Sequence, residues 1–234
     1  MISSNIVKNF FNNFDIIKYP LFVGILLSIT AAILGVVLVL KRYSMIGDGL
    51  SHVSFGALSI AIALGFAPIK FSIPIVIIAA FFLLRLAENG KMKSDAAIAM
   101  VSASSLAIGV IVTSLTTGLS TDVCSYMFGS ILAMSKDDVI FSVVLSVVVI
   151  MFGFCYHRIF AVTFDESFSK ATGVKVGMYN TLISIFTAVT VVLGIKMMGA
   201  MLISSLIIFP ALTSMRVFKS FLSVTICSAI LAVI

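Results

Sequence analysis

The chain has 234 residues, of which 61% are hydrophobic and only 10% are charged. Soluble globular domains carry about 25% charged residues, so this composition excludes a water-soluble globule and indicates a polytopic membrane protein. The formal charge of +6 comes from Lys and Arg residues between the apolar runs, which membrane orientation explains without any nucleic-acid partner.

The first 19 residues place apolar side chains at three- and four-residue spacing opposite Asn, Lys and Asp. This pattern is typical of a helix lying in the membrane interface, either as a passive anchor or as a lateral contact with a partner. Pro20 follows the segment 1–19. Because proline cannot donate the helical hydrogen bond, we expect it to separate this interfacial helix from the first span.

Charge-free windows mark the candidate spans, because a hydrocarbon core of roughly 30 Å requires about 20 apolar residues. They predict an all-α transmembrane bundle that forms a single domain over residues 1–234. About eight such windows occur, at 21–40, 49–69, 71–84, 96–115, 139–156, 176–195, 197–215 and 220–234. The last window ends with the chain, so we expect a truncated final span.

A carboxylate and an imidazole stand four residues apart at the start of the second window. On a helix, Asp48 and His52 lie on one face with Cβ atoms roughly 5–6 Å apart, so one divalent metal ion can contact both side chains. Ionisable groups among membrane spans are unfavourable and indicate a functional site. A second interpretation stays open, in which Asp48 caps the helix by accepting backbone N–H groups and His52 donates to a neighbouring helix.

The Lys and Arg residues divide unevenly between the two sides of the predicted bundle. One side has ten and the other has five, so the richer side is expected to be cytoplasmic. The connection 157–175 then lies in the cytosol. Within it, an acidic start, Lys170 and the following Gly173 predict a short helix, which is either a docking site for another protein or a solvated turn.

The stretch 196–214 combines small residues with a proline inside an apolar run. Small residues allow helices to approach closely, and proline bends a helix. We therefore expect a kink at Pro210, in a helix that is either a moving gate or simply a packed span. Lys196, Gly199 and Pro210 are the candidate gating or packing residues.

Motifs that are missing narrow the function further. The chain has no G-x-x-x-x-G-K-[ST] sequence, so it is not expected to bind ATP phosphates in a P-loop or to be an enzyme, and any energy that it uses must come from elsewhere. One possible function is that of a stand-alone secondary transporter with a proton-coupled metal site at Asp48 and His52. Such a transporter should show two related halves, and no repeat is evident in the sequence. An intramembrane metal-dependent enzyme is another possible function, but Asp122 and His157 are too distant in sequence to nominate as partners.

Five short motifs follow one another along the chain. They are KRYSMIGDGLSH at 41–52, DAAI at 95–98, YMFGSILA at 126–133, FDESFSKATGV at 164–174, and Lys196-x-x-Gly199 followed by Pro210-Ala211. Together they resemble the membrane permease subunit of ABC-type zinc and manganese importers, the ABC-3 family. The resemblance extends from about residue 20 to the end of the chain.

The resemblance implies a bacterial inner-membrane permease that works as a homodimer in the lipid bilayer. Two cytosolic ABC ATPases would dock on it, and an extracytoplasmic metal-binding protein would deliver the ion. Asp48 and His52 match the positions that line the metal pathway. The loop resembles the family's ATPase-coupling helix, and its matching residues are Phe164, Asp165, Glu166, Phe168, Ala171 and Gly173.

The resemblance and the side chains together suggest the cargo. Carboxylate and imidazole ligands suit zinc, and manganese or ferrous iron nearly as well, since no thiolate is present to favour softer ions. We predict zinc as the transported ion, on the strength of the family, and no permanently bound cofactor. Transport would proceed by alternating access driven by the ATPase partners.

Overall fold

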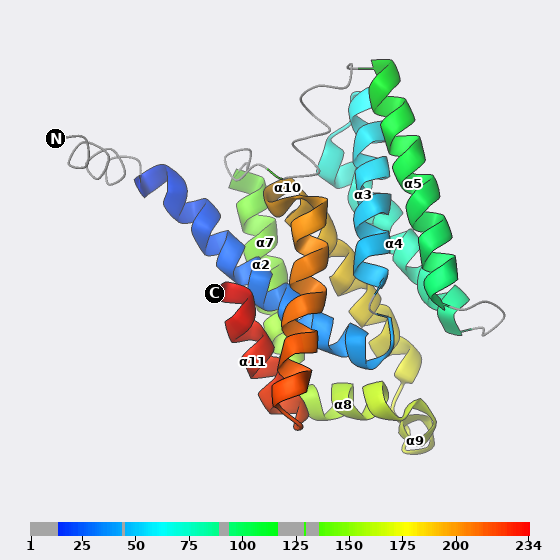
Figure 1. Ribbon diagram of the computed structural model, residues 1–234, viewed down its shortest axis with the longest axis vertical. Helices are drawn as coiled ribbons and strands as arrows, with labels where there is room; N and C mark the ends of the chain where they lie inside the picture. The colour runs from blue at the N-terminus through cyan, green and yellow to red at the C-terminus, as the bar shows by residue number, and fades with distance from the viewer. Residues whose placement is uncertain (1–13, 44, 89–93, 117–128, 130–135) are drawn as a thin grey trace.

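A computed structural model describes residues 14–43, 45–88, 94–116, 129 and 136–234, and every regular element in these ranges is an α-helix (Figure 1). The predicted all-α class is therefore confirmed for the part of the chain described. The helices are α2 (Phe14–Leu40), α3 (Ile46–Ala63), α4 (Pro68–Glu88), α5 (Ser94–Thr116), α7 (Lys136–Phe154), α8 (Tyr156–Phe164), α9 (Glu166–Ala171), α10 (Val176–Val217) and α11 (Phe221–Val233).

The prediction of eight spans is not supported. Among the described residues, four helices are long and apolar enough to cross a membrane, or five if α7 and α8 form one bent span. The windows 176–195 and 197–215 are two helical parts of α10, which is not helical at Gly199, while the apolar helices Pro68–Leu83 and Phe221–Val233 are shorter than the about 20 residues a span needs. The absence of charged residues describes the composition of a window but does not determine the length of the helix that forms there.

The start of α2 differs from the sequence expectation. The predicted interfacial helix lies mostly in residues 1–13, outside the described part of the chain, but Pro20 is described and lies inside α2. The proline therefore does not separate two helices. It removes only one backbone hydrogen bond, a loss that membrane helices tolerate where neighbouring groups compensate for it.

Close packing on three sides fixes the position of α3, which contacts α4, α5 and α10. A Cβ atom added at Gly56 would lie 2.8 Å from the Ser105 carbonyl oxygen of α5, and one added at Gly49 would lie 2.6 Å from Ile98 Cγ2. Any larger side chain at either glycine would push α5 away. The small residues that the sequence places around Asp48 thus allow the close helix approach expected of them.

A sharp break interrupts α10 at Gly199, whose φ of 83° and ψ of 162° are not helical. A Cβ atom added at Gly194 would lie 2.6 Å from Ile203 Cδ1, although nine residues along a straight helix span roughly 13 Å. The chain therefore turns back at Gly199, as Figure 1 shows at the end of the bundle that carries the α10 label. The break lies at Gly199, and the backbone at Pro210, where the kink was expected, stays helical.

The connection 157–175 contains more helix than the sequence predicted. Its first part is α8, which meets α7 at an angle of 75° next to Cys155 and lies across the end of the bundle (Figure 1). The short helix predicted after it is confirmed as α9. Helix α8 carries exposed Phe and His residues, and the sequence predicts only a connection between spans over this stretch.

Candidate functional site

Asp48 and His52 lie together near the start of α3. Asp48 is in the first turn of the helix, and its Oδ1 atom is 3.7 Å from His52 Nε2. The Asp48 side chain is 39% exposed and that of His52 is 25% exposed. Met45, rather than Asp48, occupies the N-cap position, so the helix-cap interpretation of Asp48 does not match the position of this residue.

The separation of the two side chains suits a shared ion. It is longer than the roughly 3.2 Å limit of an N–H···O hydrogen bond. A metal about 2.1 Å from a carboxylate oxygen and an imidazole nitrogen can join atoms up to about 4.2 Å apart, so one ion can contact both without movement of the helix. Within the described ranges no third His, Cys, Asp or Glu joins the pair, so it supplies two ligands and leaves other coordination positions open.

Ser51 fixes the turn of helix that carries Asp48. Its hydroxyl donates to the Asp48 carbonyl oxygen at 2.7 Å and lies 3.2 Å from the Ser204 hydroxyl of α10. The Ser51 side chain is completely buried. The imidazole Nδ1 of His52 is also buried, and among the described residues it has no hydrogen-bond partner. The α3 side of the site is therefore held against α10, while the histidine keeps an unused polar atom.

The predicted coupling residues form a capped helix with two different faces. Asp165 caps α9 by accepting a hydrogen bond of 2.8 Å from the Phe168 backbone N–H, and Gly173 ends it with a φ of 82°. The side chains of Phe164 and Phe168 are 60% and 61% exposed, and Ala171 is exposed as well. Phe168 and Ala171 of α9, with Phe164 at the end of α8, are therefore open to a partner.

Glu166 lies on the other face of α9 and points into the protein. Its Oε1 atom accepts hydrogen bonds from Lys41 Nζ at 2.7 Å and from Asn180 Nδ2 at 3.0 Å. Partial burial alone would raise the pKa of Glu166, but these two hydrogen bonds and the positive charges of Lys41 and Lys170 outweigh it, so the pKa is lowered. Glu166 is therefore ionised at neutral pH.

Sequence reasoning missed Lys41 and Asn180 as functional candidates. Lys41 Nζ also donates to Asn180 Oδ1 at 2.7 Å, so three residues from the end of α2, from α9 and from the start of α10 meet at one point. The only available signal was an asparagine inside the apolar window 176–195. The sequence separation of 125 residues between Lys41 and Glu166 gave no indication that they meet.

The candidate gating residues are distributed along α10. Lys196 is half-buried and lies one turn before the break at Gly199, and Pro210 is buried in the second half. That second half packs on the start of α3, because a Cβ atom added at Gly47 would lie 3.1 Å from Ile207 Cδ1. The break at Gly199 therefore precedes, in sequence, the segment of α10 that contacts the helical turn containing Asp48.

These features define an all-helical, multi-pass membrane protein with an ionisable pair on a central helix and a short capped helix at one end. The model of the ABC 3 transport family matches residues 13–234, and the chain belongs to this family. The resemblance drawn from the five motifs is confirmed, although the motif 126–133 lies outside the described residues except for Gly129.

Named relatives and a solved structure agree with this assignment. The high-affinity zinc uptake system membrane protein ZnuB of Haemophilus influenzae is 28% identical over 87% of this chain and 78% of its own length. The manganese import system permease protein ScaB of Streptococcus gordonii is 27% identical over 94% of this chain and 79% of its own. The structure of PsaBC from Streptococcus pneumoniae in complex with Fab has a TM-score of 0.82 at 26% identity and covers 100% of this chain and 83% of that one.

Proposed function

We propose that this chain is the permease subunit of an ABC importer that moves a divalent transition metal into the cytoplasm, and we favour zinc as the cargo. The observation that carries the proposal is the Asp48–His52 pair, whose Oδ1 and Nε2 atoms lie 3.7 Å apart on one face of α3. Relatives named as zinc uptake and manganese import proteins support a metal as the cargo.

The pair suits an ion in transit better than a resident one. A transport site must bind its ion strongly enough to select it and weakly enough to release it. Two protein ligands with open coordination positions meet this requirement, whereas structural zinc sites are closed by four ligands. Zinc is our choice on the strength of the family, because the two ligands suit manganese or ferrous iron nearly as well, and these ions are the alternative cargo.

In this proposal the permease works as a homodimer in the bacterial inner membrane. The side richer in Lys and Arg faces the cytosol, so α9 meets one of two ABC ATPases there, and an extracytoplasmic protein delivers the metal. The exposed side chains of Phe168 on α9 and of Phe164 at the end of α8 support this docking role. ATP hydrolysis takes place in the partner chains, and the permease alternates between outward and inward access.

Metal uptake by cells tests the proposal. Cells that express the chain with its transport partners receive radioactive zinc or manganese in separate assays. ATP-dependent uptake of one metal should fall at least roughly tenfold in Asp48→Ala and in His52→Ala, because even a group that only orients a metal ligand is typically worth 10- to 100-fold. His157→Ala, which removes the exposed histidine of α8, serves as the matched control and should take up metal normally.

Two outcomes would contradict the proposal. Unchanged uptake in both site variants, at normal protein levels in the membrane, would place the metal pathway away from Asp48 and His52. Uptake that persists when the ATPase partner is omitted would indicate a stand-alone secondary transporter.

A further inference from the structure

A cluster of three polar side chains, which we name the polar link, joins α9 to two long apolar helices. It consists of Lys41 at the end of α2, Glu166 in α9 and Asn180 near the start of α10. Lys41 Nζ donates to Glu166 Oε1 and to Asn180 Oδ1, both at 2.7 Å, and Asn180 Nδ2 donates to Glu166 Oε1 at 3.0 Å. Each member contacts both of the others, so no two of these helices can separate without breaking a bond.

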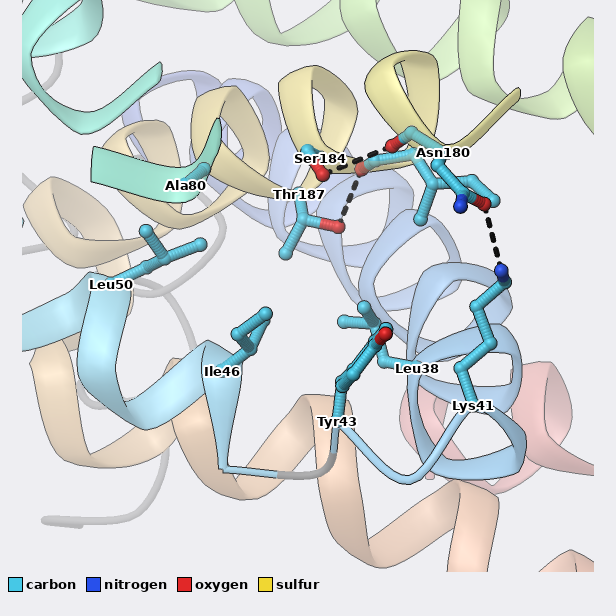
Figure 2. Close-up of a pocket in the computed structure, with 10 residues that line it drawn as sticks. Leu38, Lys41, Tyr43, Ile46, Leu50, Ala80, Asn180, Ser184 and Thr187 are labelled. Carbon is cyan, nitrogen blue, oxygen red and sulfur yellow. Dashed lines mark hydrogen bonds between the residues drawn. The ribbon is translucent and has the colours of Figure 1, made fainter. Parts of the chain in front are cut away.

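The burial of Lys41 restricts the movement of the polar link. The Lys41 side chain is only 5% exposed. The adjacent cavity, lined in part by Tyr43 and Thr187, has a volume of about 10 Å³, close to the minimum for a single water molecule (Figure 2). The lysine ammonium is therefore held between Glu166 and Asn180, and leaving this buried charge without Glu166 is strongly unfavourable. When α9 moves, Lys41 has to move with it.

The polar link leads from α9 to the metal-binding candidates by two routes. Lys41 lies seven residues before Asp48, in the short turn between α2 and α3. Asn180 lies in α10, whose second half reaches α3 through the contact of Ser204 with Ser51. A displacement of α9 is therefore transmitted both to the start of α3 and to the helix that packs against it.

The two faces of α9 separate two tasks. Phe168 points outward and is 61% exposed, whereas Glu166 points inward to Lys41 and Asn180. Ser169, on the inward side, is completely buried. A partner that binds the phenylalanine face can move the helix, and the inward face carries the side-chain hydrogen bonds that connect this movement to Lys41 and α10.

We propose that Lys41, Glu166 and Asn180 are positioning residues that transmit the movement of α9 to α3, so that metal uptake stays coupled to ATP hydrolysis. This inference rests on the function proposed above. It assigns Glu166 to the inside of the machinery and leaves contact with the ATPase to the exposed phenylalanines.

The test measures zinc or manganese uptake and ATP hydrolysis together, in liposomes that contain the complete transporter with its ATPase and binding protein. In Lys41→Met and in Glu166→Gln, uptake per ATP hydrolysed should fall by about tenfold, within the range typical of coupling between sites. Lys219→Met removes one exposed lysine between α10 and α11 and should keep the wild-type ratio.

The double variant Lys41→Met with Glu166→Gln separates coupling from folding. It leaves no unpaired buried charge, so its thermal unfolding midpoint should recover toward wild type while its uptake per ATP stays low. Recovery of both quantities would show that the polar link is merely structural and would overturn the inference. A wild-type uptake ratio in both single variants would do the same.

The outcome for the wild-type complex tells the two proposals apart. If the wild type takes up metal with ATP and the single variants do so equally well, only the coupling role is wrong. If the wild type shows no ATP-dependent uptake of either metal, the proposed function is wrong and the coupling role falls with it.

Discussion

The hydroxyl groups of Ser51 on α3 and Ser204 on the second half of α10 lie 3.2 Å apart in the buried interior. Ser51 also donates to the Asp48 carbonyl oxygen, so this contact joins α10 to the helical turn that carries a candidate metal ligand. The position of the Asp48–His52 pair therefore depends on where α10 lies.

Removal of the Ser204 hydroxyl should destabilise the helix packing. We expect Ser204→Ala to lower the free energy of unfolding by about 1 kcal/mol, the typical value of a buried hydrogen bond. That corresponds to a decrease of about 2–4 °C in the unfolding midpoint for a chain of this size. Ser205→Ala is the matched control, because both hydroxyls can donate to the carbonyl four residues earlier but only that of Ser204 can donate to Ser51 of α3 instead. Equal midpoints for the two variants would contradict this prediction.

The break in α10 should require glycine. At a φ of 83° and a ψ of 162°, Gly199→Ala should lower the stability by about 1–3 kcal/mol, because residues other than glycine are strained in this region. Gly177→Ala lies in the same helix, and an added Cβ would meet nothing within 4 Å, so it should be neutral or stabilising. Thermal unfolding in detergent compares the two. A neutral Gly199→Ala would mean that the break does not need its observed backbone geometry.

The salt bridge between Glu166 and Lys41 should remain intact at mildly acidic pH. Because the pKa of Glu166 is lowered from its ordinary value of 4.5, the bridge stabilises the folded chain above that value, and this contribution is lost as the pH falls through the lower folded pKa. The difference in unfolding midpoint between wild type and Glu166→Gln should be constant from neutral pH to about pH 5 and should shrink below pH 4.5. A difference that already shrinks near pH 6 would indicate that the folded pKa is raised instead.

The outward face of α9 should determine the affinity for the ATPase. We expect Phe168→Ala to weaken the binding of the ATPase by about 30-fold, equivalent to the roughly 2 kcal/mol of a strong interface residue. Its fold should be unaffected, because the side chain is 61% exposed. Phe66→Ala, at an exposed phenylalanine between α3 and α4, is the control, and titration of detergent-purified permease with the ATPase measures both. Equal affinities would place the docking surface elsewhere.

Local features of the chain could be predicted from sequence because they depend on neighbouring residues. Asp165 and Gly173 bound α9 as a cap and a left-handed terminus, which is a relation within nine residues. The spacing of Asp48 and His52 places both on one face of α3, as observed. In each case helix geometry alone determines the arrangement.

Features that depend on distant contacts could not be predicted. The polar link joins residues 41, 166 and 180, and nothing in their local sequence indicates that they meet. The break in α10 was expected at Pro210 but lies at Gly199, where the backbone turns back so that Gly194 meets Ile203. The number of spans was overestimated because window composition does not determine where one helix ends and the next begins.

Because α8 meets α7 at an angle of 75°, a rotation at their junction displaces the far end of α8. The nine residues of α8 span roughly 13 Å, with the pivot at Cys155 and α9 at the far end. A rotation of about 10° at the pivot displaces that far end by about 2 Å, so the 2.7 Å hydrogen bond between Lys41 and Glu166 is kept only if the Lys41 side chain moves as well. Small angular changes at the end of α7 are thereby converted into displacements that the Lys41 side chain must follow.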